Sequence, residues 1–497
     1  MSSAEAATMG AERLSASRAD RRLPTLTTAQ LMALAAAVVA FAAAAFAPQL
    51  LWDGDTFWHI RTGEWMLAHH QVVRVDPFSF TAYGRAWVDL EWLSEVLMAA
   101  VYGVGGFPLL DLMFGLCIGA LTWILASALL RKLPVFTSAA ALFLVLACTT
   151  QSWLARPHLL TLPILALWTV QLMQAREADR APPLWLVPVM ALWTNLHGSF
   201  LIGLALIGPF ALEALVEARG AAARLQVVRG WGLFGVLALL ACLVTPHGLN
   251  GLIYPVKLIT MSSLPDIDEW KPSDFSRLQP LELSLLAALF ACLYRGVRIP
   301  LVRLIVLLGL VHLTLHQTRH QMVLAVVGAL LLAEPLARAI QGSDPLIPLA
   351  RMPRRAGVGA LAAILVAFSG VAAARAAMPA RLVEVMTAPV SALAHVPAAL
   401  RLKPVLNEYG MGGYLIFNQV RPYIDGRADM YGDDFVRDYM RIKKRDAARL
   451  RSALSSHGVQ WTIFAADDPV VKDLDALPGW KRLYADKTAV VHVRTAA

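Results

Sequence analysis

The chain has 497 residues, of which 58% are hydrophobic and 16% are charged, and its mean hydropathy is +0.57. Soluble domains carry about 25% charged residues, so this composition excludes an ordinary soluble protein and predicts a polytopic membrane protein. A net charge of +9 would indicate a nucleic-acid partner in a soluble chain. Here many arginines lie in short loops between apolar segments, so membrane orientation explains the charge and no nucleic-acid partner is expected.

The chain begins with a polar tail, residues 1–27, followed by an apolar run from about 28 to 51. That run is too long for the apolar part of a signal peptide, and no convincing cleavage site follows it. We therefore predict an uncleaved first span. Eleven spans across about 30 Å of hydrocarbon are predicted at 28–50, 107–130, 134–152, 157–174, 184–194, 198–217, 231–245, 281–294, 299–316, 320–338 and 356–377.

Basic residues predict the orientation of these spans. If the N-terminus is cytoplasmic, most basic residues of the short turns fall on the cytoplasmic side, as the positive-inside rule requires. They include Arg131, Lys132, Arg176, Arg180, Arg219, Arg224, Arg229, Arg295, Arg298, Arg338, Arg351, Arg354 and Arg355. With eleven spans the C-terminus then lies outside. We expect a multi-pass protein of the bacterial cytoplasmic membrane, with a transmembrane domain at 28–379 and an outer domain at 380–497.

Polar residues of chemical interest fall on the opposite, outer side. Two outer segments, 51–106 and 246–280, are too long to be simple connectors, and long loops in compact proteins are usually functional. In the first loop, helices are predicted from Asp55 to His70 and from Asp89 to Tyr102, the second ending at Gly105-Gly106. Trp58, Arg61 and Trp65 share one face of the first helix, which suits the lipid headgroup level.

Asp53 and Asp55 lie where the first span meets the outer surface, with Gly54 between them. Partial desolvation there raises the pKa of a carboxylate and suits it to general-base catalysis. The alternative is that the Asp-Gly-Asp sequence only stops the span and caps the next helix.

An acidic pair after the first span, followed by two surface-lying helices, resembles the GT-C superfamily of integral membrane glycosyltransferases. The resemblance covers the layout of the membrane part and the DGDTFWH stretch, and the DPFSFT and EWL strings resemble a bacterial subgroup. It implies transfer of a sugar from a polyprenyl-phosphate donor to a glycan, lipid or protein acceptor on the outer face of the membrane. It also implies that Asp55 or Asp53 is the catalytic base, with Asp55 preferred.

Such a transfer also needs cations that hold the leaving phosphate, and arginine binds phosphate through two N–H groups. Arg156 and Arg319 are exceptions among the short outer turns, which are otherwise nearly free of basic residues. With His158 and His320 they are predicted to bind the donor phosphate. The alternative is that both arginines anchor the protein at the headgroups.

Further outer residues are candidates for binding the sugar or acceptor: His59, Asn195, His197, Glu269 and Trp270. Asn195 and His197 have a structural alternative, a helix-to-helix hydrogen bond, and Glu269 could belong to a solvated acidic turn. A divalent metal remains possible because carboxylates and histidines gather on one side, although no tight ligand motif occurs. The four cysteines lie in apolar segments and are interpreted as packing residues.

The outer domain is predicted to be a small α/β domain. Strands are expected around Val405, after the glycine-rich turn of EYGMGGYLIF, at VQWTIFA and at AVVHVR, and one helix near 435–455. The GMGG string lacks the spacing of a dinucleotide-binding motif. Asp425 to Asp429 is interpreted as a turn with a local ion pair, or alternatively as a lip that binds the acceptor.

The predicted fold is a transmembrane helical bundle with this α/β domain outside, and the predicted activity is glycosyl transfer. Two other functions stay open: a flippase for a lipid-linked saccharide and a non-catalytic assembly protein of envelope polysaccharide. Transporters place polar groups near the membrane midplane, often with inverted repeats. In this chain the polar groups lie at span ends and no internal repeat is found, which favours the enzyme.

Overall fold

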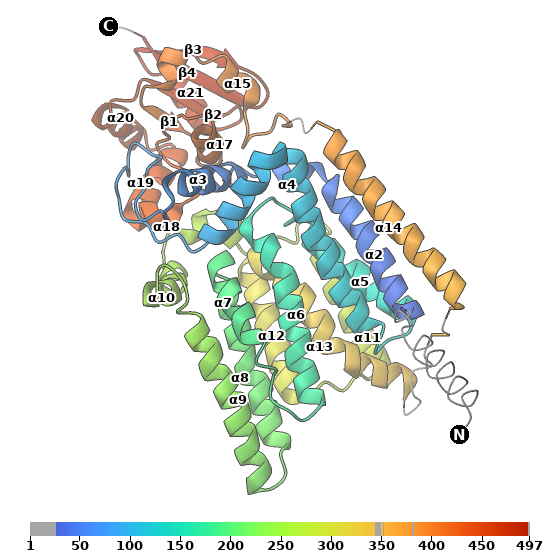
Figure 1. The fold of residues 1–497 in the computed structure, drawn as a ribbon. Helices are drawn as coiled ribbons and strands as arrows, with labels where there is room; N and C mark the ends of the chain where they lie inside the picture. Colours follow the sequence, from blue (N-terminus) through green and yellow to red (C-terminus); the bar gives the residue numbers. More distant parts are fainter. Residues whose placement is uncertain (1–25, 343–348, 351, 380–381, 496–497) are drawn as a thin grey trace, which may run out of the picture.

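The computed structural model describes residues 26–342, 349–350, 352–379 and 382–495. Figure 1 shows a bundle of long helices with a smaller domain of short helices and strands at one end, where the C-terminus lies. Both parts agree with the predicted fold, a helical membrane bundle with a small α/β domain.

Each of the eleven predicted spans corresponds to a helix. These helices are α2 (Thr28–Ala45), α4 (Trp92–Leu129), α5 (Val135–Thr150), α6 (Pro157–Glu177), α7 (Leu186–Leu196), α8 (Phe200–Glu217), α9 (Ala221–Ala241), α11 (Pro280–Arg295), α12 (Leu301–His316), α13 (Gln321–Gln341) and α14 (Arg354–Ala377). Within the described ranges, seven are long and apolar enough to cross a membrane, and α5, α7 and α12 are shorter apolar helices. The number of crossings therefore stays a prediction.

The first outer loop forms two helices, as predicted. The 3-10 helix η1 (Pro48–Leu51) leads to α3 (Asp55–His69), and α4 begins at Trp92. Inside α4, Gly105 and Gly106 leave helical geometry, and the φ of Gly106 is +63°. Glycine adopts this conformation without strain, so the chain turns here from the surface-lying part of α4 into its apolar part.

The prediction that Trp58 faces the headgroups is wrong. Trp58 is buried in a core that joins the first outer loop to the C-terminal domain, together with Met66, Trp87, Ile424 and Tyr431. In Figure 1, α3 lies directly beneath the C-terminal domain. The C-terminal domain therefore covers the side of α3 that the sequence pattern assigns to lipid.

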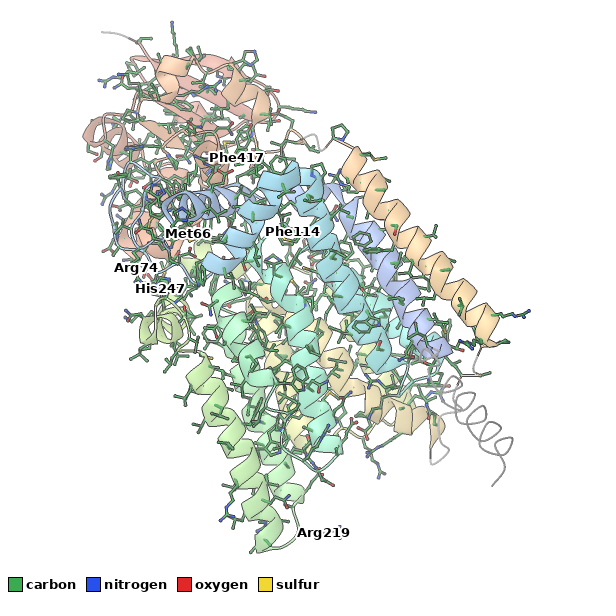
Figure 2. All side chains as sticks on the ribbon, in the orientation of Figure 1. Met66, Arg74, Phe114, Arg219, His247 and Phe417 are labelled. Carbon is green, nitrogen blue, oxygen red and sulfur yellow. The ribbon has the colours of Figure 1, made fainter. Side chains whose placement is uncertain are left out.

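A buried ion pair joins two helices near one end of the bundle. Figure 2 shows Arg219 at the far end of the bundle from Arg74 and His247, which lie on the side of the C-terminal domain. Near the Arg219 end, Glu213 of α8 accepts two hydrogen bonds from Arg303 of α12, at 3.0 and 2.8 Å. Both residues are buried, so this ion pair ties two helices together inside the protein.

The C-terminal domain is built around a four-stranded sheet of order β1-β2-β4-β3. Its strands are β1 (Val405–Asn407), β2 (Trp461–Ala465), β3 (Trp480–Ala485) and β4 (Ala489–Arg494). β1 and β2 are parallel, whereas β4 is antiparallel to β2 and β3. The strands predicted around Val405, at VQWTIFA and at AVVHVR are confirmed, and β3 was not predicted.

Two predictions for this domain are wrong. The glycine-rich segment does not feed a strand but forms η5 (Tyr409–Met411) and α17 (Gly412–Phe417). In α17, Gly412 packs closely against Ile424 and Asp425, and Gly413 packs against Gly54 and Trp58. The single helix expected near 435–455 is two helices, α19 (Asp433–Lys443) and α20 (Ala447–Ser456). Arg445 has a φ of +67° and the Asp446 carboxylate caps α20, which breaks the helix between them.

The remaining short elements connect these parts. They are α10 (Leu249–Leu258), η2 (Leu264–Asp266), η3 (Asp268–Trp270), η4 (Thr318–His320), α15 (Val390–Ala394), α16 (Ala398–Arg401), α18 (Ala428–Tyr431) and α21 (Pro469–Asp475). The second outer loop is fixed to the C-terminal domain because the Asp433 carboxylate accepts hydrogen bonds from Ser262 and Ser263. Tyr254 donates a further hydrogen bond to Asp429, at 2.9 Å.

Candidate functional site

The site begins at the turn between α2 and α3. The Asp53 carboxylate accepts a hydrogen bond from the backbone N–H of Asp55, at 2.9 Å. Gly54 lies between them against the C-terminal domain: an added Cβ would stand 2.0 Å from the carbonyl oxygen of Gly410. Likewise, a Cβ on Gly413 would stand 2.0 Å from the carbonyl oxygen of Gly54. The glycine between the two acids therefore allows two backbones to meet.

Arg156 lies at the centre of the site, at the N-cap position of α6 just before Pro157. Its Nη1 is 3.2 Å from Asp53 Oδ2 and 3.0 Å from Glu269 Oε2, and its Nη2 is 3.0 Å from Asp55 Oδ2. Burial disfavours the charged guanidinium, but the three carboxylates together raise its pKa well above the usual value. One cation thus gathers three acids from two outer loops.

Arg319 supplies a second cation from η4. Its Nη1 is 3.4 Å from Glu269 Oε1, and its guanidinium carbon lies 4.0 Å from the centre of the Trp270 ring. Glu269 therefore bridges both arginines. Burial alone would raise the pKa of Glu269, but Arg156 and Arg319 outweigh it and lower the pKa to about 2. A permanently ionised carboxylate occupies the space between two arginines.

The pKa of Asp55 is shifted in the opposite direction from that of Glu269. Burial raises its pKa to about 7, and neighbouring Asp53 adds to the effect, while Arg156 and a hydrogen bond from Trp58 oppose it. The Trp58 Nε1–H donates to Asp55 Oδ1 at 2.9 Å. A carboxyl with a pKa near neutrality exchanges protons readily at physiological pH, so Asp55 has the chemistry of a general base.

Solved structures with the same architecture include the Archaeoglobus fulgidus oligosaccharyltransferase. Its apo form matches with a TM-score of 0.51 and 12% identity, covering 88% of this chain and 70% of that chain. The same enzyme tethered to an acceptor peptide with the NVT sequon matches with a TM-score of 0.50 and 12% identity, covering 94% and 74%. The chain shares the fold of this oligosaccharyltransferase.

A further structural match is the arabinofuranosyltransferase AftD from mycobacteria, with a TM-score of 0.49 and 14% identity. It covers 95% of this chain and 42% of that chain, so the present chain spans less than half of the mycobacterial enzyme. No protein-family model and no curated protein matches the sequence. At 12% identity the match to the oligosaccharyltransferase shows a shared fold alone, and the chemistry has to come from the residues.

Glu91 also belongs to the site, although no sequence pattern selected it. Its Oε1 is 3.3 Å from His197 Nε2 and its Oε2 is 3.7 Å from His59 Nε2. Burial raises the pKa of Glu91 to about 8, with Arg156 opposing the effect. Burial also keeps the pKa of both imidazoles well below the usual value. The only sequence signal was its place in the DLEWLSE string of the first outer loop.

The other predicted residues surround this cluster with bonds of their own. His158 Nε2 is 2.8 Å from the Ser152 carbonyl oxygen, and His320 Nε2 is 3.1 Å from the side-chain oxygen of Gln317. Asn195 makes the helix-to-helix contact: its amide donates to the Val244 carbonyl at 2.7 Å, and its oxygen accepts from Trp92 at 2.8 Å. Their roles in binding donor or acceptor stay predictions.

Across the described ranges, no group of three or more His, Cys, Asp or Glu side chains is arranged to hold a metal ion. Cys117, Cys148, Cys242 and Cys292 are all unpaired.

Proposed function

We propose that the protein is a membrane glycosyltransferase that moves a sugar from a polyprenyl-phosphate donor to an acceptor on the outer face of the bacterial cytoplasmic membrane. The observation that carries this proposal is the cluster around Arg156, which brings Asp53, Asp55 and Glu269 together beside Arg319. Asp55 can accept a proton, and Arg156 and Arg319 can bind a phosphate beside it. A glycosyl transfer of this kind requires both groups close together.

In the proposed reaction Asp55 takes the proton of an acceptor hydroxyl, and that oxygen forms the new bond to the sugar carbon. The bond between this carbon and the phosphate oxygen breaks, and its electron pair stays on the phosphate. Arg156 and Arg319 stabilise the charge that develops there. Glu269 now occupies both arginines, so the donor phosphate would take the place of its carboxylate.

Asp55 is the better base of the two acids. Asp53 uses one carboxylate oxygen to cap α3 and the other to contact Arg156. The pKa of Asp55, about 7, allows it to accept a proton and release it again near neutral pH. We therefore assign Asp53 to positioning and Asp55 to proton transfer.

We also propose how the chain is oriented in the membrane. The N-terminus is taken as cytoplasmic, with residues 28–379 as the membrane domain and 380–497 as a domain on the outer side. The cluster around Arg156 lies at the end of the bundle next to the C-terminal domain, where α3 is (Figure 1). Its position at one end of the helices favours an enzyme over a carrier, since carriers place polar groups near the midplane.

The test is transfer by the full-length protein in membranes, using radiolabelled sugars on synthetic polyprenyl monophosphates and diphosphates. Asp55→Asn should lower transfer by about 10²–10⁴-fold, the contribution of a general base, with normal folding. The matched control is Asp268→Asn, whose carboxylate is 95% exposed and pairs with Lys271 in the same loop as Glu269. Wild-type transfer by both Asp55→Asn and Asp53→Asn would remove the assignment, and movement of intact labelled lipid without bond cleavage would support a carrier.

A further inference from the structure

The three residues Asp425, Gly426 and Arg427 follow Ile424 in the C-terminal domain and reach the turn at Asp55 in three dimensions. Asp425 and Arg427 form the ion pair expected of this turn: Arg427 Nε and Nη2 donate to the two Asp425 carboxylate oxygens, both at 2.7 Å. Arg427 Nη1 donates to Asp76 Oδ1 at 2.8 Å. Asp76 belongs to the first outer loop, so this arginine joins the two parts of the chain.

Arg427 and its two carboxylate partners are buried, which fixes the orientation of the guanidinium. Arg427 is 2% exposed, and both carboxylates are fully buried. A buried guanidinium with paired carboxylates is held in one orientation, because loss of any contact would leave a charge without its partner. The hydroxyl of Tyr431 also donates to Asp425 Oδ2 at 2.7 Å, which fixes the acid from the other side.

The fixed guanidinium packs against aromatic rings of the first outer loop. Its carbon lies 4.9 Å from the ring centre of Trp87, 5.4 Å from that of Phe78 and 5.8 Å from that of Trp58. Arginine over an aromatic ring is attractive within about 6 Å. Trp58 is buried as well, and its indole N–H is the group that donates to Asp55 Oδ1.

Gly426 provides a second contact between the same turn and the same carboxylate. An added Cβ on Gly426 would stand 1.9 Å from Asp55 Oδ1. The backbone of the C-terminal domain therefore forms one wall of the space around Asp55. The carbonyl of Gly426 accepts a hydrogen bond from the Tyr409 hydroxyl at 3.1 Å, which holds this wall in place.

We propose that Arg427 is a positioning residue of the site: held by Asp425 and Asp76, it fixes the Trp58 indole, and the indole fixes the Asp55 carboxylate. This inference rests on the proposed role of Asp55 and gives the C-terminal domain a function in it. The domain sets the orientation of the base through one buried arginine. Arg427 itself does not contact the reacting atoms and acts through the Trp58 indole.

The readout is the pH at which Asp55 is half protonated. The charged and titratable groups that face Asp55 are Asp53, Arg156, Glu269 and Tyr409, and the variants below leave all four in place. The Trp58 hydrogen bond stabilises the ionised form of Asp55, so its loss raises the pKa. A structural role alone would not move this midpoint.

The experiment labels the full-length protein in detergent with dicyclohexylcarbodiimide, which reacts with protonated carboxyl groups, and measures the labelled fraction of Asp55 by mass spectrometry across pH. Trp58→Phe should raise the labelling midpoint by about one pH unit, the size expected for one hydrogen bond to a charged group. Trp87→Phe is the matched control, since Trp87 also packs on Arg427 but does not bond to Asp55. Arg427→Lys keeps the charge and loses the planar fork, so its midpoint should rise by a smaller amount.

Equal midpoints in Trp58→Phe and Trp87→Phe would overturn the indole step, and an unchanged midpoint in folded Arg427→Lys would overturn the role of the arginine. If Arg427→Lys does not fold, the two tryptophan variants still decide whether the Trp58 indole, on which Arg427 packs, sets the protonation midpoint of Asp55. The labelling needs no donor. A protein that transfers no sugar but shows these shifts refutes the proposed function alone, whereas transfer without the shifts refutes only this inference.

Discussion

Replacing Gly426 by alanine tests how closely the C-terminal domain approaches the proposed base. The added methyl group would stand 1.9 Å from Asp55 Oδ1 and 2.7 Å from its Cγ. Because Cβ atoms essentially never come within 3.0 Å of another heavy atom, the two groups must separate by at least 3.0 − 1.9 = 1.1 Å. A displacement of about 1 Å at a reacting group costs about 10²-fold in rate.

We therefore expect Gly426→Ala to lower kcat for sugar transfer by about 10²-fold, with a smaller change in KM for the donor, since the arginines are not displaced. The assay is turnover of a radiolabelled polyprenyl-phosphate sugar by full-length protein. Gly410→Ala is the matched control in the same domain: its added Cβ would meet only the Thr387 methyl group, at 3.3 Å. Near-wild-type kcat in Gly426→Ala, or an equal loss in Gly410→Ala, would refute the steric argument.

Three further outcomes are expected. Since the pKa of Asp55 is about 7 and the ionised form is the base, kcat/KM should fall about tenfold per pH unit below pH 7; a rate that is flat through this region would contradict the assignment. Arg319→Lys should raise KM for the donor by about tenfold, because lysine lacks the fork that binds two phosphate oxygens, and an unchanged KM would place the phosphate elsewhere. Glu213→Gln should destabilise the protein by about 3 kcal/mol, because buried Arg303 loses its closest carboxylate and keeps Glu334 at 3.8 Å; the measurement is thermal loss of the monodisperse peak in size-exclusion chromatography. The exposed Glu217→Gln should change it by less than about 1 kcal/mol, and similar losses in both would show that burial does not decide the cost.

Much of the candidate site was predictable because its charged residues lie in turns and span ends where the rest of the chain has few charges. Arg156 and Arg319 are basic residues in outer turns that otherwise nearly lack them, and both contact Glu269. Asp53 and Asp55 stand at the end of the first span, where a charge is costly without a partner. Such exceptions in an apolar sequence are visible without coordinates.

Glu91 could not be found in this way, and for Arg427 the sequence predicted a turn with a local ion pair or an acceptor-binding lip, but not its contact with Asp76. Both lie in segments with many other polar residues, so neither violates a local pattern. Their partners are distant in sequence: Glu91 meets His197 from the turn after α7, and Arg427 meets Asp76 of the first outer loop. The same holds for Trp58, whose spacing fits a lipid-facing helix until the C-terminal domain covers it.

The amino-acid sequence by itself determined the helical bundle, because hydrocarbon admits only apolar helices with their backbone groups bonded internally. From the positions of the basic turns it also predicted an orientation in the membrane. Only the tertiary structure decided which acids share Arg156, why glycine separates Asp53 from Asp55, and that the C-terminal domain reaches the base. Those features depend on side chains and backbones that meet at distances of about 3 Å from remote parts of the chain, and periodicity or composition carries no information about such meetings.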